Sequence, residues 1–127
     1  MYVLLIALLG ADVIGQVPAT SPVVYDAIEE LNALRASRGL APYIRDEGLT
    51  QGAARAAVVR ANNQIVGHTS NDFFYLPPGA VATAAGCAAW KPEWGFGSCC
   101  KFGNYTYAGA AWAPGRDGKR YMHLFVR

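Results

Sequence analysis

Two segments of helical periodicity, joined by a corner that contains glycine and proline, constrain the fold of this chain most strongly. Ser21 and the proline after it can start a helix, and apolar residues then recur at three- and four-residue spacing, which predicts a helix over residues 22–38. Gly39 can end that helix in the left-handed conformation. Asp46 can cap a second helix, whose leucine and alanine residues recur every four positions until it fades near residues 62–65.

The second half of the chain combines turn-rich sequence with the pattern of a β-hairpin. The alanine-rich run over residues 80–90 predicts a third helix, and residues 73–75 predict a short strand or a packed loop. Residues 105–112 and 119–126 have the composition of two strands, and Pro-Gly-Arg-Asp-Gly between them is turn chemistry. Helices first and an antiparallel pair last predict an α+β fold.

The N-terminus carries an apolar run of the kind found in secretory signal peptides. Residues 2–11 are apolar or small without interruption, which is too short to span a bilayer but long enough for the apolar region of a signal peptide. We therefore predict a signal peptide over residues 1–19, cleavage between residues 12 and 20, and one domain over residues 20–127. This makes the protein secreted, extracellular or periplasmic. A buried strand and an N-terminal membrane anchor are the alternatives.

Three cysteines, Cys87, Cys99 and Cys100, fit an oxidising compartment. A bond between the adjacent pair would close a strained ring, so we expect Cys87 to form a disulfide with Cys99 or Cys100 and one thiol to remain. No Cys-x-x-Cys pair or cysteine–histidine spacing of a structural zinc site is present.

Composition and charge exclude some partners. Hydrophobic residues make up 53% of the chain, which argues against disorder. The net charge is only +2, Lys and Arg form no run, and no aromatic residue alternates with a basic stripe. We therefore expect no nucleic-acid partner. We also expect the protein to be a monomer.

Thirteen positions between residues 31 and 68 follow a family pattern: Leu31, Asn32, Arg35, Gly39, Leu40, Pro42, Asp46, Leu49, Ala53, Ala57, Ala61, Gly67 and His68. They resemble the opening of the CAP superfamily, the SCP-like extracellular domain of pathogenesis-related proteins, cysteine-rich secretory proteins and venom antigens. The resemblance implies a three-layer α-β-α sandwich and a cleft in which two histidines and two acidic residues face each other.

The resemblance carries over to only part of that cleft. His68 stands at the first histidine, and Glu93 completes a Trp-x-x-Glu motif that begins at Trp90. Ala80 stands where a Gly-Glu-Asn motif would supply the other glutamate. Asn104 replaces the histidine of a Gly-His-Tyr-Thr motif, and Tyr105 follows it. The candidate cleft residues are therefore His68, Glu93, Asn104 and Tyr105, with Ala80 leaving a gap.

This set supports binding better than catalysis. Zinc needs three or four good ligands, so His68 and Glu93 would hold it weakly at most, and we expect no cofactor. The function expected is a non-enzymatic binding or interaction module for an extracellular ligand such as a lipid or a peptide. The alternative is a peptidase-like hydrolase in which Glu93 orients His68 for acid–base catalysis, although no nucleophile is marked. His123 is expected to be a core or sheet-edge histidine.

Overall fold

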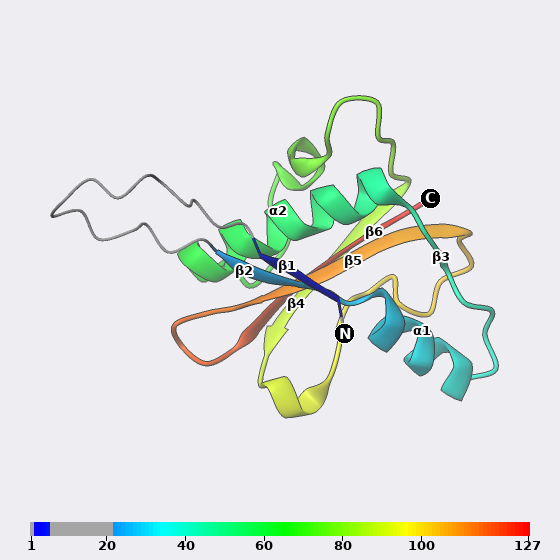
Figure 1. The fold of residues 1–127 in the computed structure, drawn as a ribbon, viewed down its shortest axis with the longest axis horizontal. Coiled ribbons are helices and arrows are strands. Elements are labelled where there is room, and N and C mark those ends of the chain that lie inside the picture. The colour runs from blue at the N-terminus through cyan, green and yellow to red at the C-terminus, as the bar shows by residue number, and fades with distance from the viewer. Residues whose placement is uncertain (1, 6–21) are drawn as a thin grey trace, which may run out of the picture.

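The computed structural model describes residues 2–5 and 22–127, so most of the predicted signal peptide and its cleavage region lie outside the described residues. Within that part, six strands form one sheet in the order β1-β2-β5-β6-β4, and β3 pairs in parallel with β5 (Figure 1). The described strands are β1 (Tyr2–Leu5), β2 (Val23–Asp26), β3 (Ile44–Arg45), β4 (Ala84–Trp90), β5 (Tyr107–Pro114) and β6 (Arg120–Val126). The mixture of helices with a largely antiparallel sheet confirms the predicted α+β class.

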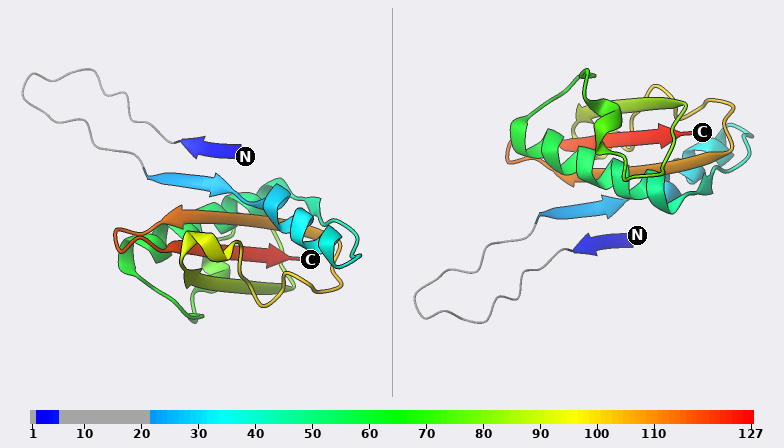
Figure 2. Two further views of the ribbon diagram at one scale, coloured as in Figure 1. Left: turned by 90° about the horizontal axis from the view of Figure 1, so that it is seen from below. Right: turned by 90° about the horizontal axis from the view of Figure 1, so that it is seen from above.

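The longer helix, α2 (Glu47–Asn63), covers one face of the sheet (Figure 2). Asp46 caps it as predicted, because its side chain accepts a hydrogen bond from the Leu49 N–H at 2.9 Å. Small residues on α2 and β5 bring the two backbones together. A Cβ placed on Gly109 of β5 would lie 2.1 Å from the Thr50 amide nitrogen, so only glycine fits there. This core contains Leu49, Ala53, Ala57, Ala61, Tyr121 and Phe125.

The shorter helix, α1 (Ile28–Ser37), lies on the opposite face with the loop that precedes β5 (Figure 2). Its buried Leu31 belongs to a second core with Phe96, Met122 and Leu124. The buried Arg35 fastens that loop, because its guanidinium donates to the carbonyl oxygens of Lys101 at 3.0 Å and Gly103 at 2.9 Å. Apolar residues of β6 therefore face a helix on each side of the sheet.

The predicted start of the first helix is wrong. The residues before Ile28 form β2, which lies between β1 and β5 in the sheet. Burial alternates along this segment as in a strand: Val24 and Asp26 are buried, whereas Val23 and Tyr25 are only half-buried. The Asp26 carboxylate then accepts a hydrogen bond from the Ile28 N–H at 2.9 Å, and the helix begins there.

The predicted third helix is also wrong, because residues 84–90 form strand β4 and pair with β6 along their whole length. Sheet pairing outweighs the helical preference of alanine, and the small side chains admit a loop on top of the strand. Residues 73–75 are neither strand nor plain loop but part of the 3₁₀ helix η1 (Asp72–Tyr75). The hairpin prediction is confirmed by β5 and β6, whose register pairs Ala108 with Val126.

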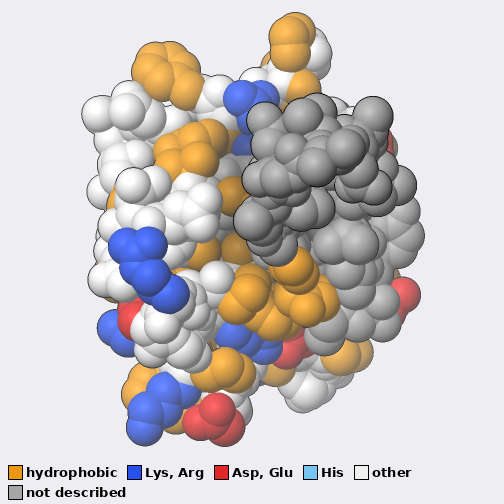
Figure 3. Space-filling model, turned by 60° about the vertical axis from the view of Figure 1, so that its left-hand side comes forward, with side chains coloured by type: hydrophobic (Ala, Val, Ile, Leu, Met, Phe, Trp, Pro, Cys, Tyr) orange, Lys and Arg blue, Asp and Glu red, His pale blue; other side chains and the backbone are white. Residues whose placement is uncertain are grey.

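On the face drawn in Figure 3, hydrophobic side chains lie among scattered Lys and Arg side chains and a few Asp and Glu side chains, so neither sign of charge covers that face. Among the described residues, no helix combines the length and the apolar character needed to cross a membrane.

Candidate functional site

His68 follows α2 and forms a hydrogen bond with a carboxylate outside the predicted set of site residues. Its Nδ1 lies 2.8 Å from Oδ2 of Asp72, the first residue of η1. The His68 side chain is 53% exposed, whereas that of Asp72 is only 4% exposed. The imidazole is therefore held from the protein side by a buried carboxylate and remains open to solvent on its other side.

A buried arginine fixes that carboxylate. Arg60, near the end of α2, donates from Nη2 to the other Asp72 oxygen at 2.7 Å and from Nη1 to the Gly67 carbonyl oxygen at 2.7 Å. Burial acts to raise the pKa of Asp72, but the hydrogen bond with His68 and the charge of Arg60 outweigh it, so the pKa is lowered. Asp72 is consequently ionised at neutral pH, and the turn that leads to His68 is tied to α2.

The free nitrogen of His68 faces a thiol. Its Nε2 lies 3.9 Å from Cys99 Sγ, and Cys99 is an exposed residue of the loop between η2 (Pro92–Trp94) and β5. Cys99 Sγ also lies 3.7 Å from Cys100 Sγ and 3.7 Å from the Ala85 carbonyl oxygen of β4. We call Cys99, His68 and Asp72 the thiol site.

The three thiols have different environments. Burial, followed by the hydrogen bond with Cys99, raises the pKa of Cys100 to about 12. Burial also raises the pKa of Cys87, which lies on β4. Cys100 and Cys87 are half-buried, whereas Cys99 is exposed beside the imidazole. Cys99 is therefore the thiol best placed to react.

A glycine of β4 makes room for the thiol. A Cβ placed on Gly86 would lie 1.9 Å from the Ser98 hydroxyl oxygen and 3.2 Å from Cys99 Sγ. Any side chain at position 86 would push the loop that carries Cys99 off the strand. Gly86 is unfavourable in a helix over residues 80–90, but in strand β4 it is required by the close approach of this loop.

His123 is a core residue, as expected, and belongs to the same buried network. It is fully buried on β6, and its Nδ1 accepts a hydrogen bond from Arg60 Nε at 3.1 Å. Burial, followed by the charge of Arg60, lowers the pKa of His123 to about 3. The histidine is therefore neutral and serves Arg60 as an acceptor.

The predicted pair of His68 with Glu93 is wrong, because His68 pairs with Asp72 while Glu93 lies exposed on η2. Asn104 is exposed in the loop before β5, and Tyr105 packs its ring over Gly103. Among the described residues, neither Glu93 nor Asn104 has a hydrogen bond to His68. The surviving family positions therefore do not assemble one site around the imidazole.

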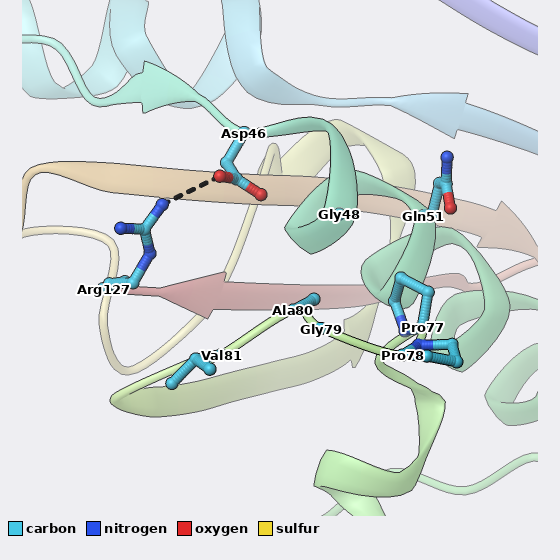
Figure 4. Close-up of a pocket in the computed structure, with 9 residues that line it drawn as sticks. All are labelled: Asp46, Gly48, Gln51, Pro77, Pro78, Gly79, Ala80, Val81 and Arg127. Atoms are coloured by element: carbon cyan, nitrogen blue, oxygen red, sulfur yellow. Dashed lines mark hydrogen bonds and ion pairs between the residues drawn. The ribbon is translucent and has the colours of Figure 1, made fainter.

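Ala80 lines a separate pocket of ≈ 560 Å³ at the start of α2 (Figure 4). One wall is polar, since Arg127 Nη2 lies 2.9 Å from Asp46 Oδ2, and Gln51 of α2 also lines the pocket. The other wall is the Pro77–Val81 segment. We call this the Asp46–Arg127 pocket, and no histidine is among the described residues that line it.

The described residues contain no group of three or more His, Cys, Asp or Glu side chains that could hold a metal ion. All three cysteines are free thiols in the structure, so the predicted disulfide stays a prediction. Sequence reasoning missed Asp72, Cys99 and Arg60 as site residues. The four-residue spacing of His68 and Asp72 was the one local signal, whereas Cys99 approaches only through the fold.

Comparisons with family models, with curated proteins and with solved structures find no match for this chain. The geometry of the site is therefore the basis for assigning a function.

Proposed function

We propose that this protein carries out nucleophilic thiol chemistry at Cys99, with His68 as general base and Asp72 as the residue that orients it. One observation carries the proposal: His68 lies between the two, with Nδ1 2.8 Å from the Asp72 carboxylate and Nε2 3.9 Å from the thiol. A nucleophile, a base and a group that orients the base form the arrangement that activates cysteine in many enzymes.

The carboxylate determines which nitrogen of His68 can act as the base. Asp72 is ionised, so the neutral imidazole donates its Nδ1 proton to Asp72 Oδ2. The lone pair of Nε2 then faces Cys99, where it can accept the thiol proton. The separation of 3.9 Å exceeds a hydrogen bond, and such contacts commonly shorten when substrate binds.

Acyl transfer is the reaction class that this arrangement serves. The thiolate attacks a carbonyl carbon, and the resulting S–C bond replaces the bond to the leaving group. The proton held by His68 Nε2 passes to the leaving group. Water then hydrolyses the thioester with His68 again as the base, which restores the thiol and releases the acid. The proposed reaction is a form of the hydrolase alternative considered from the sequence. Asp72 takes the orienting role first given to Glu93, and Cys99 supplies the nucleophile that the sequence did not mark.

The test is turnover of an activated ester, 4-nitrophenyl acetate, by the wild type and three variants. We expect mass spectrometry to detect an acetyl group on Cys99 in the wild type and none at position 99 in Cys99→Ser. His68→Asn should slow acylation by about 10²-fold, the lower end of the effect of a general base. Cys100→Ser is the matched control and should retain most of the rate. Equal rates in the wild type and His68→Asn would refute base catalysis.

A non-enzymatic binding function is the second candidate, favoured by the Asp46–Arg127 pocket. Its adjacent carboxylate and guanidinium suit a small ligand that carries both charges, such as a short peptide with free ends. Calorimetric titration with short peptides, in the wild type and in Arg127→Ala, tests this. Binding that survives the substitution would place the ligand elsewhere.

The scaffold is proposed to be a CAP-type sandwich. The sequence pattern around His68 supports this, as do helices α1 and α2 on opposite faces of the sheet. An experimentally determined structure that superposes on a CAP domain is the test. The extracellular or periplasmic location also remains a proposal, and N-terminal sequencing of exported protein tests it.

A further inference from the structure

Six basic and aromatic side chains form a continuous chain of ring contacts on the α1 side of the sheet. Three segments that are distant in sequence contribute to it: the end of α1, the loop after Cys100, and the end of β4 with η2. In spatial order the residues are Arg38, Phe102, Lys101, Trp90, Trp94 and Lys91, which we call the cation–ring strip.

The contacts follow one another without a gap. The Arg38 guanidinium lies 4.1 Å from the centre of the Phe102 ring, and Lys101 Nζ lies 5.1 Å from the same ring. Lys101 Nζ also lies 5.8 Å from the Trp90 ring. The rings of Trp90 and Trp94 are 6.2 Å apart, and Lys91 Nζ is 5.9 Å from Trp94. In the linear sequence these residues form no basic or aromatic run, so only the fold brings them together.

The strip presents both charge and an exposed ring. Trp94 is 65% exposed, an unusual state for the largest hydrophobic side chain. Arg38 and Lys91 are exposed, and Trp90, Lys101 and Phe102 are half-buried. The strip carries three positive charges, and Glu93, which lies between Lys91 and Trp94 in the sequence, offsets one of them, so the strip is net positive.

We propose that the cation–ring strip docks onto an anionic lipid surface. Tryptophan favours the headgroup region of a bilayer, where its apolar ring and polar N–H are both satisfied. Lysine and arginine beside it gain from the negative potential of the surface. Single-stranded nucleic acid suits the strip less well, because successive bases need several open ring faces and only Trp94 is largely exposed.

The test is flotation of the full chain with vesicles of phosphatidylcholine alone and with vesicles that contain phosphatidylglycerol. Each basic residue near an anionic surface contributes roughly five-fold, so a net two charges predict about 25-fold preference for the anionic vesicles. We expect 0.5 M salt to remove most of that preference. Trp94→Ala should reduce binding to both kinds of vesicle, and Lys91→Ala should reduce only the preference for anionic vesicles.

Arg55→Ala is the matched control, because Arg55 is exposed on α2, on the other side of the sheet. It should bind vesicles as the wild type does. Absence of binding, equal binding to both vesicle types, or an equal loss in Arg55→Ala would overturn the proposal. Tighter binding to a single-stranded oligonucleotide than to anionic vesicles would also overturn it. The test does not depend on the thiol site, whose assay uses Cys99 variants.

Discussion

Acidification should destabilise this protein through His123 well above the pH at which carboxylates titrate. The side chain is fully buried and accepts a hydrogen bond from Arg60, and its pKa is lowered to about 3. In the unfolded chain the same group titrates near 6.5. The unfolded state therefore binds more protons between these two values, and stability falls as the pH decreases through that window.

The loss of stability depends on how far the pKa of His123 in the folded protein lies below its value in the unfolded chain. Each pH unit inside the window costs about 1.4 kcal/mol, so His123 should remove about 2–3 kcal/mol of stability between pH 8 and pH 4.5. The groups that face His123 are Arg60 on α2, Asp72 on η1 and the imidazole of His68. The pKa of Asp72 is lowered below 3.8, so its own contribution is lost only at more acidic pH.

Urea unfolding at pH 8, 6.5, 5.5 and 4.5 measures this dependence in the wild type and in His123→Gln. Glutamine keeps an acceptor for Arg60 but does not titrate, which makes it the matched control. We expect the difference in unfolding free energy between the two proteins to shrink by about 2–3 kcal/mol toward pH 4.5. Parallel pH profiles would show that His123 is not held neutral by burial beside Arg60.

Three further predictions concern packing and capping. Gly86→Ala should displace the loop that carries Cys99, because the new Cβ would lie 1.9 Å from the Ser98 hydroxyl oxygen, and it should lower both the unfolding temperature and the acylation rate. Phe125→Ala should cost about 3–5 kcal/mol in urea unfolding, because the ring is fully buried between α2 and the sheet. Asp46→Ala should cost about 1 kcal/mol by the same assay, because the Leu49 N–H loses its cap. A value near zero for either of the last two would contradict the packing or the cap described.

The parts of the fold that the sequence predicted are those decided by local chemistry. The Asp46 cap and the leucine and alanine residues that recur every four positions after it predict α2. The turn residues after Pro114 predict the hairpin. The errors lie where a partner far along the chain decides the structure. Residues 84–90 carry a helical composition but complete the sheet beside β6, and residues 23–26 do so beside β5.

The candidate site was predictable to a smaller extent. His68 was selected, but through a family pattern that paired it with Glu93 instead of Asp72. The correct carboxylate lies four residues away, and its role depends on Arg60, which a sequence presents only as a basic residue on a helix. Cys99 comes from a loop 31 residues later and meets His68 only because that loop folds over Gly86. Local sequence patterns cannot predict a contact of this kind.

Selective alkylation measures whether His68 activates Cys99. The reduced protein is treated at neutral pH with iodoacetamide below one equivalent, and the label on each cysteine is measured by peptide mapping. We expect the label mainly on Cys99, a several-fold slower reaction of that residue in His68→Asn, and an unchanged reaction in His123→Gln. Labelling of Cys99 at the same rate in the wild type and His68→Asn would rule out activation by His68, because exposure alone would then explain the reactivity of Cys99.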